Sequence, residues 1–176
     1  MSIGHLARRF IGSLSPARPS TDDVGWVSTV LEAGEFEEFK QMRREDQRHS
    51  IAVARDVVAR LAGSPYESDS VWPATALLHD VGKVDCALGP FGRVLATCIG
   101  FACGRARVCA WSTRRGIARR LALYLRHDEL GADRLRMVGA RGPVVEWAGA
   151  HHHRAVWEST GIPEVVIAAL DAADND

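Results

Sequence analysis

Apolar residues recur at three- and four-residue spacing along most of this 176-residue chain, a pattern typical of helices. No segment alternates β-branched with polar residues, and alanine is abundant, so no strand is predicted. We therefore predict an all-α fold whose helices are separated by glycine and proline. The expected helices span about 21–33, 35–42, 45–62, 71–79, 91–101, 115–125, 130–137, 144–152 and 162–173.

The length suffices for one domain, which would bury about two thirds of the surface of the unfolded chain. Serine and proline residues punctuate residues 1–20, so this segment is predicted to be an arm or a short helix followed by a linker. Residues 21–176 are expected to form a single helical bundle. Its first helix would start at Thr21-Asp22-Asp23 and be broken by Gly34.

Charge and cysteine content exclude several classes of protein. Lys+Arg and Asp+Glu are both 22, so the chain lacks the excess of basic residues that is typical of a protein with a nucleic-acid partner. The four cysteines form no C-x-x-C pair, which argues against a zinc ribbon or a thioredoxin-like site. No export signal is recognisable, so we expect reduced thiols and a cytoplasmic location.

The longest apolar stretch spans about 94–110 and is interrupted by Arg105 and Arg107. It is too short for a membrane span, so no membrane partner is expected. We predict a helix buried in the core or in the contact of a homodimer. Four arginines that follow it would form a basic patch, either a solvated helix face or a phosphate site; they are Arg114, Arg115, Arg119 and Arg120.

Histidines and carboxylates stand in or beside apolar helical segments. They are His49, His79, Asp80, His127, His151, His152, His153, Asp171 and Asp174. Imidazoles and carboxylates that converge from several helices are what a divalent metal site in a helical bundle requires. The pair His79-Asp80 directly follows an apolar run, where burial is costly without a partner such as a cation. Both side chains can reach one ion only at a helix end, which Gly82 indicates.

The segment Ala76-Leu77-Leu78-His79-Asp80-Val81-Gly82-Lys83 resembles the HD superfamily of metal-dependent phosphohydrolases. The minimal pattern of that family is a histidine, an adjacent His-Asp pair and a distal aspartate. The matching residues here are His49, the pair itself and Asp174 in Ala173-Asp174. Asp171, one turn earlier on the same face, is the alternative for the distal aspartate.

Two further segments resemble the HD-GYP branch of the superfamily. Residues 125–132 are similar to its His-Pro-Glu-Ile-Gly-Ala segment and contribute His127, and residues 150–154 are similar to its His-His-Glu. His152 and His153 are the preferred matches there, with His151 as the alternative. The Asp-Gly-x-Gly-Tyr-Pro motif of the branch is absent, with Ile162 in place of the tyrosine, so hydrolysis of cyclic-di-GMP is not expected.

The resemblance implies an HD-type bundle that holds one or two divalent ions of Mn, Fe, Co, Ni or Zn. His49, His79 and Asp174 would hold the first ion, His127, His152 and His153 the second, and Asp80 would bridge them. Asp80 and Lys83 are the candidate catalytic residues, and Lys83 would bind phosphate oxygens. The expected activity is hydrolysis of a phosphate ester or phosphodiester of a nucleotide or related small molecule. A di-iron oxygenase and a catalytically silent regulatory module are the alternatives.

Read without the resemblance, the same residues have simpler interpretations. His49 would be a satisfied core histidine, and His127 an exposed residue at a helix start. The run from His151 to His153 would be a solvated tract, and the terminal acids a frayed chain end. The two sets of interpretations differ in one structural respect, which is whether these side chains converge.

Overall fold

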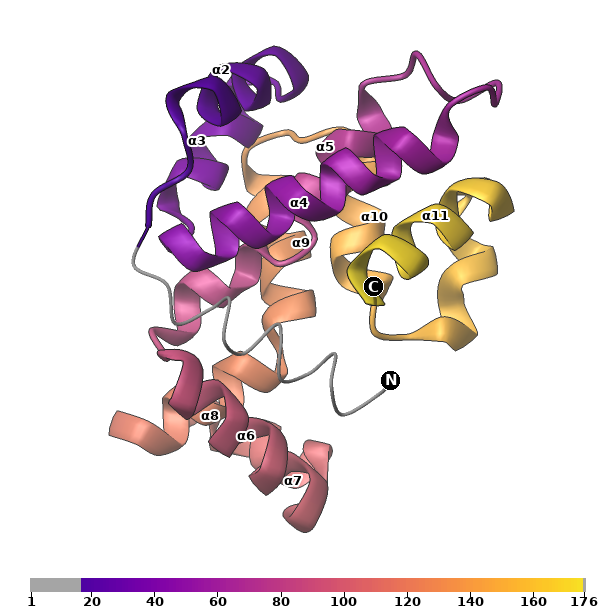
Figure 1. Cartoon of the computed structure of the whole chain (residues 1–176). Helices are drawn as coiled ribbons and strands as arrows, with labels where there is room; N and C mark the ends of the chain where they lie inside the picture. The colour runs from indigo at the N-terminus through magenta and orange to yellow at the C-terminus, as the bar shows by residue number, and fades with distance from the viewer. Residues whose placement is uncertain (1–16, 176) are drawn as a thin grey trace.

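The computed structural model describes residues 17–175, and all regular structure in this range is helical (Figure 1). The prediction of an all-α, single-domain fold is confirmed. The first sixteen residues of the expected N-terminal arm lie outside the described range. The elements are the α-helices and 3₁₀ helices (η) α2 (Thr21–Val30), α3 (Ala33–Gln41), α4 (Arg44–Leu61), α5 (Val71–Leu78), η1 (Val81–Cys86), α6 (Pro90–Cys103), α7 (Arg105–Cys109), η2 (Ala110–Thr113), α8 (Gly116–Leu125), α9 (His127–Met137), α10 (Gly142–Ala150), η3 (Arg154–Thr160) and α11 (Glu164–Asn175).

The first break in the chain falls earlier than the sequence predicts. Helix α2 ends at Val30, and Gly34, the expected breaker, lies inside α3. The break is set by Glu35, whose buried carboxylate accepts hydrogen bonds from the backbone N–H of Glu32 and from the guanidinium of Arg141. Gly34 serves close packing instead, because a Cβ there would lie 2.8 Å from the carbonyl oxygen of Val138.

Helix α5 forms the centre of the main core, since all eight of its residues are buried. Helices α4 and α10 pack along it, and α11 packs on α4 (Figure 1). These contacts bring segments from both halves of the chain to the C-terminal end of α5. The His-Asp pair follows at that end.

Helices α6, α7 and α8 form a lobe below the main body in Figure 1, with a smaller core of its own. The expectation that the apolar stretch at 94–110 is buried in the protein core is wrong. It is split at Gly104, whose φ is 85°, and Ala96 is the buried residue of α6. The region formed by α6, α7 and α8 is called the lobe from here on.

Among the described residues, no single helix is long and apolar enough to cross a membrane. The segments Val71–Cys86 and Pro90–Cys103 reach the length and apolar composition of a membrane span only when they are taken together, and the pair is bent by 88°.

Candidate metal centre

The His-Asp pair lies where α5 gives way to a 3₁₀ helix. Helix α5 ends at Leu78, and η1 begins at Val81. His79 and Asp80 occupy the junction, and each is 2% exposed. Two adjacent residues on a continuous helix would point about 100° apart. The change of helix type after Leu78 lets both side chains face the same interior region.

His49, His79 and Asp174 converge from α4, α5 and α11 and form the first cluster. Their ligand atoms all lie within 4.8 Å of one another. Oδ1 of Asp174 is 3.1 Å from Nε2 of His49 and 3.5 Å from Nε2 of His79. The structure thus brings together the three residues that the sequence assigned to the first ion. The alternative aspartate, Asp171, forms an ion pair with Arg154 at 2.7 Å instead.

A second cluster consists of His127, His151 and His152, whose ligand atoms also lie within 4.8 Å of one another. His127 is the first residue of α9, and the other two follow the end of α10. Nε2 of His127 is 3.2 Å from Nε2 of His152. Three imidazoles and no carboxylate make up this cluster, a donor set that suits transition metals.

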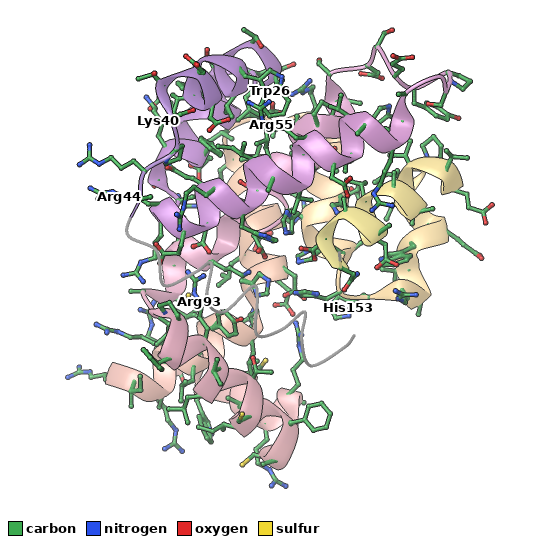
Figure 2. All side chains as sticks on the ribbon, viewed as in Figure 1. Trp26, Lys40, Arg44, Arg55, Arg93 and His153 are labelled. Atoms are coloured by element: carbon green, nitrogen blue, oxygen red, sulfur yellow. The ribbon has the colours of Figure 1, made fainter. Side chains whose placement is uncertain are left out.

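His153, a preferred ligand in the sequence analysis, lies outside the second cluster, and His151, the alternative there, lies within it. The backbone leaves the helical region at His153, where φ is −121° and ψ is 75°, so the side chain turns away from His151 and His152. Nε2 of His153 is 2.8 Å from a carboxylate oxygen of the buried Asp128. Figure 2 shows His153 at the edge of the main body, on the side of the lobe.

Asp80 lies between the two clusters and presents one oxygen to each. Its Oδ2 is 3.3 Å from Nε2 of His79, and its Oδ1 is 3.2 Å from Nε2 of His127 and 3.8 Å from Nε2 of His151. Gly82 makes this possible, because a Cβ there would overlap the carbonyl oxygen of His127. Backbone contact between η1 and α9 therefore places Asp80 beside the second cluster.

The hydrogen bonds of the imidazoles leave their Nε2 atoms available as ligands. Nδ1 of His79, His127 and His151 donates to the carbonyl three residues earlier, at 2.8, 2.7 and 3.0 Å respectively. A carbonyl only accepts, so Nδ1 carries the proton and Nε2 of the neutral ring has a free lone pair. Nε2 of His151 is buried without a hydrogen-bond partner, and Nε2 of the buried His79 has the carboxylates of Asp80 and Asp174 beside it, at 3.3 and 3.5 Å. A cation is the partner that such atoms fit.

Electrostatics keep the central carboxylate ionised. Burial would raise the pKa of Asp80, but Lys83 and His79 hold it well below its usual range. Burial would lower the pKa of His79, but Asp80 and Asp174 raise it to about 10. Burial and the neighbouring His152 keep the pKa of His151 far below its ordinary value of 6.5, so that ring is neutral. A divalent ion would replace the proton on His79, and its binding would release that proton.

A cavity of about 470 Å³ adjoins the two clusters, a size suited to a small molecule. The ammonium of Lys83 contacts Oδ2 of Asp80 at its wall. Arg154 adds a second cation, and Tyr124 stacks on the ring of His127. The roles of Arg154 and Tyr124 were not predicted from the sequence. Tyr124 precedes His127 by three residues, and this helical spacing is the signal that could have identified it.

Comparisons with protein-family models, with curated proteins and with solved structures find no match to this chain. The assignment of the candidate metal centre rests on its own geometry.

The two neighbouring histidines allow a matched test of the second cluster. We expect His152→Ala to weaken binding of the second divalent ion by at least about 100-fold, since it removes a ligand atom. His153→Ala removes only the hydrogen bond to Asp128 and should change that affinity by less than about tenfold. Calorimetric titration of each metal-stripped variant with Mn²⁺ or Co²⁺ measures the two affinities. Equal losses in the two variants would contradict the assignment.

Proposed function

We propose that this chain is a metal-dependent phosphohydrolase of the HD superfamily. Its substrate would be a phosphate ester or phosphodiester of a nucleotide or a related small molecule. The observation that carries the proposal is the Asp80 carboxylate, which lies between two clusters of three potential metal ligands each. The order of these residues along the chain also follows the HD pattern, apart from the exchange of His153 for His151.

Two clusters that share a carboxylate favour a pair of divalent ions. Ions held in this way would supply Lewis-acid polarisation of a phosphoryl group and lower the pKa of water. The residues of the chain supply position and charge. Asp80 would fix the separation of the two sites, and the neutral ring of His151 would offer its Nε2 lone pair to the second.

Cationic side chains at the cavity support an anionic substrate. Lys83 lies beside Asp80 and can donate hydrogen bonds to phosphoryl oxygens. Arg154 is held by Asp171 and is well exposed, so it can contact a second anionic group. A nucleotide combines such charges with a flat base, and the partly exposed Tyr124 supplies aromatic surface at the same cavity.

The test is phosphate release by the metal-loaded protein. Metal content is measured by mass spectrometry after purification, and a panel of nucleotides and other phosphoesters is then screened with Mn²⁺, Co²⁺, Zn²⁺, Ni²⁺ and Fe²⁺. We expect bound transition metal and release of phosphate from at least one ester. Bound metal with no phosphate release from any ester would contradict hydrolysis. Oxygen consumption by the iron-loaded protein would then identify the oxygenase alternative.

A further inference from the structure

Helix α6 presents an apolar side to solvent. Val94 and Leu95 are each about half exposed, at 49% and 48%, and Phe101 is 94% exposed. Cys98 and Ala102 are also exposed and share this side of the helix. The opposite side packs on α8, where Ala96 is buried and Gly100 faces Leu125. The apolar side of α6 therefore takes no part in the core of the lobe.

The same lobe carries a strong local charge, although the whole chain is neutral. The segment 86–127 contains eight arginines and no aspartate, glutamate or lysine. Three of these arginines are neutralised by carboxylates outside the segment, in the pairs Arg93–Asp46, Arg105–Asp128 and Arg126–Glu129.

The other five arginines are exposed, and within residues 17–175 none of them pairs with a carboxylate. They are Arg107, Arg114, Arg115, Arg119 and Arg120. Unpaired charges of one sign on a small lobe add up at distances within the Debye length of about 8–10 Å. The lobe therefore attracts anions while its α6 side offers uncovered apolar surface.

We propose that the α6–α8 lobe docks on an anionic lipid bilayer surface. Leu95, Phe101 and their apolar neighbours would enter the boundary between headgroups and acyl chains, and the arginines would contact lipid phosphates. Apolar side chains on one helix face beside unpaired arginines are the combination that interfacial helices use. This inference is independent of the proposed function.

Charge argues against a second copy of this chain as the occupant. A twofold contact across α6 would bring two arginine-rich lobes together, and like charges oppose association. A nucleic acid would match the charge but would leave Val94, Leu95 and Phe101 without a partner, since its interfaces are polar.

Sedimentation with lipid vesicles tests the proposal on the full chain. Vesicles made of equal parts phosphatidylglycerol and phosphatidylcholine should bind the protein at low salt, and vesicles of phosphatidylcholine alone should not. High salt should weaken the binding. The double variants L95S/F101S and R119Q/R120Q should each lower the partition coefficient by at least about tenfold.

Two control variants remove similar groups from outside the lobe. Met137→Ser removes an 80% exposed side chain of α9, and R18Q/R44Q removes two exposed arginines, of which Arg44 lies at the start of α4 (Figure 2). Both should bind the anionic vesicles as the wild type does. Thermal unfolding should be unchanged in all four variants, because the altered side chains are exposed.

Several results would overturn the proposal. These are the absence of sedimentation with the anionic vesicles at low salt, and equal binding by the lobe variants and their controls. Formation of a dimer that L95S/F101S abolishes, without vesicle binding, would assign the face to a second copy. Binding of an oligonucleotide without vesicle binding would assign the arginines to nucleic acid.

Discussion

Asp80→Asn should lower phosphate release by at least about 10³-fold and remove tightly bound metal from the protein. The substitution keeps the shape of the side chain but replaces one carboxylate oxygen by an amide nitrogen, which cannot ligate a cation. The amide is neutral, so both His79 and His127 lose the anionic partner that they have in Asp80. Loss of a group that acts jointly with others removes most of the catalytic effect of the whole set.

The same substitution also lowers the stability of the protein, and this effect has to be distinguished from the loss of activity and of bound metal. Lys83 and His79 lose their common counter-charge in a site where both are largely buried. Removal of one partner from such a cluster destabilises by about 3–5 kcal/mol. The double variant Asp80→Asn/Lys83→Met removes both charges and should recover much of the stability in the metal-stripped protein. It should remain without metal and without activity.

Asp171→Asn is the matched control, because Asp171 lines the same cavity and belongs to neither cluster. Its exposed ion pair with Arg154 contributes no more than about 1 kcal/mol, so metal content should be that of the wild type. Urea unfolding, metal analysis and phosphate release are measured on all three variants. An Asp80→Asn protein that is folded, loaded with metal and active would refute the role given to Asp80.

Gly82→Ala should destabilise the protein by more than about 3 kcal/mol, beyond the usual cost of overpacking. The added Cβ would overlap the carbonyl oxygen of His127 and lie 2.5 Å from the backbone nitrogen of Gly131. Both atoms belong to the backbone of α9, so no side-chain rotation can relieve the contact. The 3₁₀ segment would have to move away from α9, which separates Asp80 from His127. We therefore expect loss of the second ion together with the loss in stability.

Gly25→Ala is the control for this prediction, since nothing lies within 4 Å of a Cβ at that position in α2. Alanine is favoured over glycine in a helix by about 0.5–1 kcal/mol, so this variant should be as stable as the wild type or slightly more stable. Urea unfolding and calorimetric metal titration compare the two substitutions. A Gly82→Ala protein within about 1 kcal/mol of the wild type and with two ions bound would contradict the packing argument.

The period and the breaks of the apolar pattern were enough to predict the all-α fold. Spacing is local information, and helix formation depends mainly on local contacts and on one buried face. The first break was placed too late because it depends on Glu35, whose buried carboxylate accepts from the backbone N–H of Glu32 and from Arg141, a residue far away in the chain. Of the two alternatives predicted for the 94–110 stretch, burial in the protein core was wrong for a similar reason. Apolar composition alone does not say whether another element is available to cover a helix.

The sequence alone determined which residue types could form the candidate site. The order of these residues along the chain indicated the resemblance to the HD superfamily. Only the tertiary structure decided which of them meet. Three consecutive histidines are alike in sequence, yet a turn of the backbone at His153 sends its ring to Asp128 while His151 enters the second cluster. Asp174 rather than Asp171 meets His49 because of how α11 packs on α4. A metal site needs donor atoms within a few ångströms, and that precision comes from the packing of several helices rather than from spacing along one.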